Sequence, residues 1–173
     1  MAGMKGKQTV RDMILSLGLI CVAAGVIYLF VPHDDKEPEL KRLDYRVELL
    51  TARRAASYPV AAPEGLPDSW KATSVRFQGD QSDAWHLGYH APDGQYVGVE
   101  QSAAEKTSEF IEDATQGAEK TEDTEEIGGR TWQRYEGERY DALVLPGEGS
   151  TTVVTGSASF AQLRTMAEAL ETE

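Results

Sequence analysis

A run of nineteen uncharged residues near the N-terminus constrains this chain most strongly. The run extends from Met13 to Val31 and reads MILSLGLICVAAGVIYLFV. A helix of this length is about 28 Å long, at about 1.5 Å per residue. That length matches the hydrocarbon core of a bilayer. We therefore expect residues 13–31 to form a single transmembrane helix whose partner is the lipid bilayer.

The residues on either side of this run indicate its orientation. Lys5, Lys7 and Arg11 precede it and acidic residues follow it, and the basic flank of a membrane helix usually stays in the cytoplasm. A cleaved signal peptide is the alternative. Its apolar region is usually about 7–15 residues long and ends at small residues, whereas this run ends in FVPHDD. We therefore expect a cytoplasmic tail at 1–12, an uncleaved anchor in the cytoplasmic membrane and an outer part from residue 32 onward.

Charge and cysteine content narrow the role of the outer part. From Pro32 onward the chain has 14 basic and 28 acidic residues, a net charge of −14. Such a surface repels phosphate groups, which argues against nucleic-acid binding. Cys21 is the only cysteine and lies within the apolar run. The outer part therefore contains no intrachain disulfide, and its stability depends on packing.

Small residues form a strip along the apolar run. Gly18, Cys21 and Gly25 lie at positions i, i+3 and i+7, so they share one helix face. Such a strip lets a second membrane helix approach closely. Ordinary membrane-helix composition is the alternative interpretation.

Residues 32–69 contain two different signals. Leu40, Leu43, Val47 and Leu50 recur at helical spacing, which predicts a short helix. That helix either forms a stalk or docking helix or packs on its own domain. The prolines in the following YPVAAPEGLPDSW disfavour helix and favour extended backbone, as in a linker or a segment wrapped along a sheet edge. We assign this region to a stalk helix and a proline-rich linker.

Residues 70–173 begin with a strand pattern. Trp85, Leu87 and Tyr89 alternate with smaller or polar residues, and a Pro-Asp-Gly turn precedes the next strand-like run at 96–101, which predicts an antiparallel hairpin. A helix is then expected after Ser102, because a glutamate follows three residues later at capping-box spacing.

The second half repeats this order of elements. Three strand-like stretches, TWQRYE, YDALVL and STTVVTG, precede Ser159, which with Gln162 predicts the start of another helix. We therefore expect an α+β domain in which an antiparallel sheet of about five or six strands has helices packed on one face.

Histidines give the first candidate site. His86 and His90 are four residues apart on an expected strand and so share a face, where Asp83 and Glu100 could complete a metal site. The alternative interpretation, in which the histidines bind no metal, follows from the alternation of side chains along this strand. If Trp85 is buried, both histidines face solvent or a helix. We treat them as weak metal candidates and expect no bound metal.

Other signals for chemistry are missing from the sequence. Ten acidic residues lie between 100 and 126, but EKTEDTEEIGG lacks the ligand order of a calcium loop. We interpret this region as a solvated helix face and an acidic loop. The chain also has no nucleophile elbow, phosphate-binding loop or zinc-protease motif. We therefore expect no enzyme and no cofactor.

Aromatic residues give the last candidates. Trp70, Trp85 and Trp132 are interpreted as core anchors. In the alternative, Trp85, Tyr89 and Trp132 line a pocket between helix and sheet that takes an apolar small molecule or lipid.

The chain resembles an actinobacterial membrane-protein family, domain-of-unknown-function family 4245. The segments that carry the resemblance are the proline-rich segment leading to Trp70, the KATS that follows it, and the closing TVVTGSASFAQLRTMAEAL. The resemblance covers nearly the whole chain. It implies a cell-envelope protein with its domain outside the cytoplasmic membrane, and it brings no known activity. Together these observations favour a non-enzymatic interaction module or accessory subunit, with a carrier or sensor of an apolar small molecule or lipid as the alternative.

The predicted topology can be tested with one cysteine. Because the outer part has none, a Ser150→Cys variant should react with a membrane-impermeant maleimide in intact cells whose wall has been opened. The unsubstituted protein, which has only Cys21, is the control. Labelling of the variant only after lysis would contradict the orientation.

Overall fold

The computed structural model describes residues 5–30 and 42–172, and the chain forms two compact units, Met1–Glu39 and Leu40–Glu173. Several predicted features lie outside the described residues. These are the first residues of the cytoplasmic tail, Val31 at the end of the predicted membrane helix, His33, and Leu40 of the predicted stalk helix.

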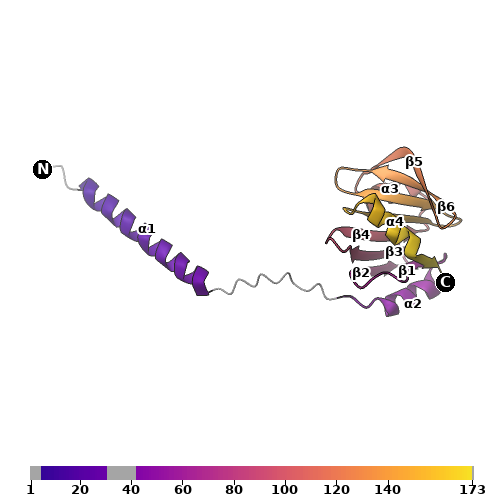
Figure 1. The fold of residues 1–173 in the computed structure, drawn as a ribbon, viewed down its shortest axis with the longest axis horizontal. Helices are drawn as coiled ribbons and strands as arrows, with labels where there is room; N and C mark the ends of the chain where they lie inside the picture. The colour runs from indigo at the N-terminus through magenta and orange to yellow at the C-terminus, as the bar shows by residue number, and fades with distance from the viewer. Residues whose placement is uncertain (1–4, 31–41, 173) are drawn as a thin grey trace. The chain divides into compact units, whose positions relative to one another are not determined.

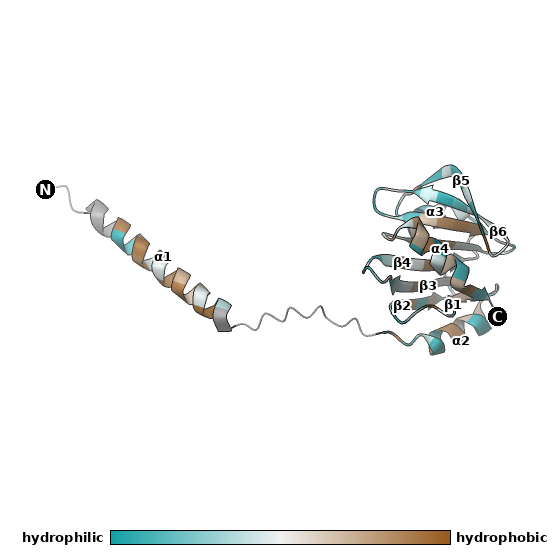
Figure 2. Ribbon diagram, viewed as in Figure 1, coloured by the Kyte–Doolittle hydropathy of each residue, from teal (hydrophilic) through white to brown (hydrophobic). Residues whose placement is uncertain are grey.

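The first unit contains helix α1 (Lys5–Phe30). Within it, Val10–Tyr28 is long and apolar enough to cross a membrane, a property that membrane anchors and signal sequences share. Figure 2 shows apolar residues along this helix. Gly18, Cys21 and Gly25 lie on its exposed surface, with open space beside both glycines.

The second unit is built on an antiparallel sheet of seven strands (Figure 1). Their spatial order is β2 (Lys71–Gln78), β3 (Ala84–His90), β4 (Tyr96–Ser102), β8 (Thr151–Gly156), β7 (Asp141–Pro146), β6 (Arg130–Glu136) and β5 (Glu119–Ile127). The α+β prediction is therefore confirmed, but the sheet has more strands than the expected five or six.

Strand β5 accounts for part of the difference. Its sequence, EKTEDTEEI, was expected to be an acidic loop, yet it pairs with β6 at the edge of the sheet. Most of its side chains are exposed or half-buried. An edge strand wetted on both faces has no apolar alternation, so the sequence pattern that identifies strands is missing.

Two helices cover opposite faces of the sheet, not the single face expected. Helix α4 (Phe160–Ala169) packs with Leu143 and Val154, whereas α3 (Thr107–Thr115) packs with Val144 and Val153. Successive side chains of a strand point to opposite faces. The two helices therefore sandwich the centre of the sheet.

Local signals for the helix ends are partly confirmed. The predicted capping box of Ser159 and Gln162 is formed at the start of α4. Helix α3 starts later than expected, at Thr107, because Ser102 ends β4 and its hydroxyl donates to the Ser82 carbonyl instead of capping a helix.

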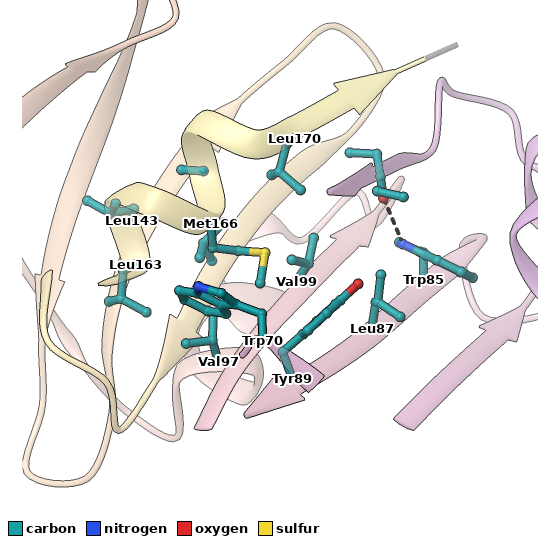
Figure 3. Packing of buried hydrophobic residues seen from close by; sticks show 14 of the residues in the cluster. Trp70, Trp85, Leu87, Tyr89, Val97, Val99, Leu143, Leu163, Met166 and Leu170 are labelled. Atoms are coloured by element: carbon teal, nitrogen blue, oxygen red, sulfur yellow. Dashed lines mark hydrogen bonds between the residues drawn. The ribbon is translucent and has the colours of Figure 1, made fainter. Parts of the chain in front are cut away.

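The main core lies under α4 and contains all three tryptophans, of which Figure 3 shows Trp70 and Trp85. Trp70, Trp85 and Trp132 are 3%, 1% and 0% exposed, which confirms them as core anchors. The Trp85 indole donates a hydrogen bond to the Ala61 carbonyl at 3.0 Å. Met166 of α4 reaches into this core from above.

The proline-rich segment wraps the edge of the domain. Strand β1 (Ala61–Pro63) pairs with β9 (Leu170–Thr172), and Tyr58 and Val60 are buried in the main core. The Trp85 bond to Ala61 ties this segment to the sheet. The sequence predicted either a linker or a segment wrapped along a sheet edge, and the structure shows the wrapped segment.

Central strand pairing depends on Gly156. It faces Val97 of β4 and Asp141 of β7, and a Cβ added there would overlap the Tyr96 carbonyl oxygen and lie 2.8 Å from its carbon. Backbone atoms cannot rotate away. We expect Gly156→Ala to cost about 1–3 kcal/mol of unfolding free energy and to lower Tm by roughly 3–12 °C.

Gly79→Ala is the matched control, because its Cβ would meet Phe77 at an ordinary 3.6 Å. Thermal melts of both variants measure the difference. Equal Tm values would show that the two strands can separate locally at no cost.

Candidate functional site

A polar surface covers half of the face on which α3 lies. Helix α3 packs on β7 and β8, and the same face continues over β4, β3 and β2. We call this continuation the open half of the sheet. Its polar side chains follow the strand alternation and include Ser74, Arg76, His86, His90, Tyr96 and Glu100.

Three of these side chains are linked in a row. The Ser74 hydroxyl oxygen lies 2.9 Å from Nε2 of His86. Nδ1 of His86 lies 2.5 Å from a carboxylate oxygen of Glu100. The two partners of His86 come from the neighbouring strands on either side, β2 and β4. We call this row the Ser74–His86–Glu100 relay.

Glycines make room for the relay. A Cβ on Gly88 would overlap the Ser74 hydroxyl oxygen, and it would lie 3.2 Å from the Tyr96 ring. A Cβ on Gly98 would lie 2.7 Å from the Tyr96 hydroxyl. The Tyr96 side chain therefore lies across two adjacent glycines, beside Ser74.

Tyrosine and arginine side chains surround the relay. The rings of Tyr96 and Tyr140 pack together with centroids 5.7 Å apart. Burial raises the pKa of Tyr96, and the charge of Glu100 raises it further, while Arg76 opposes the shift. Its hydroxyl therefore remains protonated at neutral pH and can donate a hydrogen bond. Arg76 is the direct cross-strand partner of His86 and is exposed.

Donors and acceptors in the relay can be assigned from the chemistry of its three side chains. A carboxylate only accepts hydrogen bonds, so Glu100 favours the tautomer in which Nδ1 of His86 carries the proton. Nε2 is then left with a lone pair that accepts from the Ser74 hydroxyl. The side chains of His86 and Glu100 are 17% and 20% exposed, so water competes only partly for these bonds.

The residues predicted as metal candidates are not arranged around a common point as metal ligands would be. His86 and Glu100 are joined directly, and His90 lies further along, opposite Tyr96. Asp83 instead accepts hydrogen bonds from the Ser57 hydroxyl and amide, which lower its pKa. Among residues 5–30 and 42–172, no group of three or more His, Cys, Asp or Glu side chains is arranged to hold a metal ion.

Sequence reasoning missed Ser74. It shares a strand face with Arg76, but that strand carries a bulge between Ala72 and Ser74 that changes the register. Only the register of β2 against β3 places the serine beside His86.

A second surface is formed by helix α2 (Arg46–Ala55). It packs on the domain as predicted, but through Leu49 and Ala52 and not through the predicted stripe. Leu43 packs on the core from before the start of the helix. The other face exposes Val47 and Leu50, which are 73% and 53% exposed. Within residues 42–172 these are the only large apolar side chains so exposed.

A hollow of about 450 Å³ lies next to this helix. Its lining combines apolar and charged residues: Arg42, Leu43, Asp44, Tyr45, Arg46, Leu49, Ala62, Pro63 and Glu64. The predicted pocket aromatics are elsewhere. Trp85, Tyr89 and Trp132 are at most 2% exposed, and only Tyr89 approaches the hollow, through a 2.8 Å hydrogen bond to Tyr45.

Comparison with known proteins assigns nearly the whole chain to one family. A family model described as "Protein of unknown function (DUF4245)" matches residues 5–170. No curated protein and no solved structure matches the chain.

Proposed function

The chain belongs to the DUF4245 family of proteins of unknown function, and we propose that it is a membrane-anchored extracytoplasmic module that binds a protein partner through helix α2. The observation that carries this proposal is the exposure of Val47 and Leu50. The sequence pattern of the anchor and its basic flank support the orientation, with the N-terminus in the cytoplasm and the folded unit outside.

The exposed face of α2 suits a protein interface. Two large apolar side chains on adjacent turns form a ridge, and the neighbouring hollow of about 450 Å³ can receive an anchor side chain from a partner. Interfaces commonly combine such an anchor pocket with a few apolar contacts at their centre.

Charge around the ridge indicates what kind of partner fits. Helix α2 exposes Arg46 and Arg54 against a single glutamate, Glu48, although the outer part as a whole is strongly acidic. Its third arginine, Arg53, is half-buried and donates to the Val60 carbonyl. A partner surface with an apolar centre and a carboxylate rim complements this face. Antiparallel pairing with α2 of a second copy would bring Arg46 near Arg54 of the other helix, which disfavours a symmetric dimer.

Anchoring to a membrane favours partners that share it. Confinement of two proteins to one membrane raises their effective concentration, so a small interface can be sufficient. An accessory subunit of a membrane or envelope protein fits this condition.

The hollow also supports a second candidate function. Its volume lies within the range of small-molecule sites, and Leu43, Leu49 and Tyr45 provide apolar and aromatic surface. A carrier or sensor of an apolar small molecule or lipid would use this hollow rather than the buried tryptophans.

Native mass spectrometry on the full-length protein, gently extracted from its own membranes, tests the proposal. We expect a protein companion of fixed stoichiometry that is lost in the Val47→Ser, Leu50→Ser double variant. Both side chains are exposed, so the double variant should change folding stability by less than about 1 kcal/mol.

An Ala161→Ser, Thr165→Ser variant on the exposed face of α4 is the matched control and should keep the companion. A companion retained by the α2 variant would contradict the proposal. A retained small-molecule mass without any protein companion would favour the carrier, and a homodimer would show self-association.

A further inference from the structure

We propose that Ser74, His86 and Glu100 hydrolyse esters of small acyl groups, with Ser74 as the nucleophile, His86 as the general base and Glu100 as the carboxylate that orients the histidine. This activity goes beyond partner binding and uses a different surface, the open half of the sheet. It also departs from the expectation, drawn from sequence motifs, that the chain is not an enzyme.

The connectivity of the relay carries the proposal. An activated serine needs a base at its hydroxyl and a third group that holds that base in the correct tautomer. Here Nε2 of His86 lies 2.9 Å from the Ser74 hydroxyl oxygen, and Nδ1 lies 2.5 Å from Glu100. Both distances lie within hydrogen-bonding range, and each imidazole nitrogen has the partner that its role requires.

Two neighbouring groups can stabilise the negative charge that develops on the substrate. Arg76 lies two residues from Ser74 on the same strand face and directly opposite His86. The protonated Tyr96 hydroxyl lies across Gly88 and Gly98, beside Ser74. A cation and a hydrogen-bond donor near the reacting carbonyl serve the purpose of an oxyanion hole.

The reaction needs no additional reactant except water. The Ser74 oxygen attacks the carbonyl carbon of the ester while its proton moves to Nε2 of His86. The bond from the carbonyl carbon to the alcohol oxygen then breaks, and the alcohol leaves with that proton. Water attacks the acyl-serine, passes a proton to His86 and releases the acid, and the returned proton restores the Ser74 hydroxyl.

The surroundings of Ser74 limit the substrate. The Tyr96 side chain crosses the glycines next to the serine, so a large acyl group would collide with its ring and a small one such as acetyl is favoured. The rings of Tyr96 and Tyr140, tilted by 30° to each other, offer an aromatic surface beside it. An aryl or ring-shaped alcohol can stack on such a surface.

Labelling and turnover of the full-length protein in detergent test the proposal. A fluorophosphonate probe should modify Ser74, as located by peptide mass spectrometry, and the protein should hydrolyse p-nitrophenyl acetate. Ser74→Ala should abolish both signals. His86→Gln should lower the labelling rate by about 100-fold or more, and Glu100→Gln should lower it as well.

Ser108→Ala, which removes an exposed serine on α3, is the matched control and should leave both rates unchanged. Thermal melts show whether each variant is folded. The wild-type protein alone is decisive if any variant unfolds: labelling at another serine, or no labelling at Ser74 together with hydrolysis no faster than buffer, overturns the proposal.

Discussion

Strand β8 is buried on both faces, and the architecture of the folded unit depends on covering it. All six residues of Thr151–Gly156 are buried, and the strand is the fourth of seven. Because its side chains alternate between faces, Val154 requires cover on one face and Val153 on the other. Helices α4 and α3 supply that cover. Helix α3 follows strands β2 to β4 and helix α4 follows strands β5 to β8, and the last strands of the two sets, β4 and β8, pair at the centre of the sheet.

The cover is uneven, and this determines where chemistry can occur. Helix α3 has nine residues and packs on β7 and β8, so polar side chains on β2, β3 and β4 remain partly accessible. The Ser74–His86–Glu100 relay lies in this open half. The ridge on α2 belongs to another element at the start of the folded unit. Partner binding and ester hydrolysis would therefore use separate surfaces, and either proposal can fail without the other.

Local signals predicted the parts of the fold that local interactions determine. The hairpin around Trp85, the capping box at Ser159 and the α+β class followed from alternation and cap residues. The number of strands did not, because β5 is an acidic edge strand without alternation. The sequence also did not predict which face each helix covers, because a strand that is buried on both faces has apolar side chains on both. For the site, His86 and Glu100 were named from spacing, while Ser74 required the register beyond the bulge in β2.

The tautomer of His86 tests the relay most directly. Long-range ¹H–¹⁵N correlation spectra of the full-length, histidine-labelled protein should show that the neutral His86 ring carries its proton on Nδ1 and not on Nε2, and Ser74→Ala should shift the Nε2 resonance while leaving the Nδ1 proton in place. Ser108→Ala should shift neither nitrogen. A His86 ring protonated on Nε2, or an Nε2 resonance that does not respond to the loss of the Ser74 hydroxyl, would contradict the account.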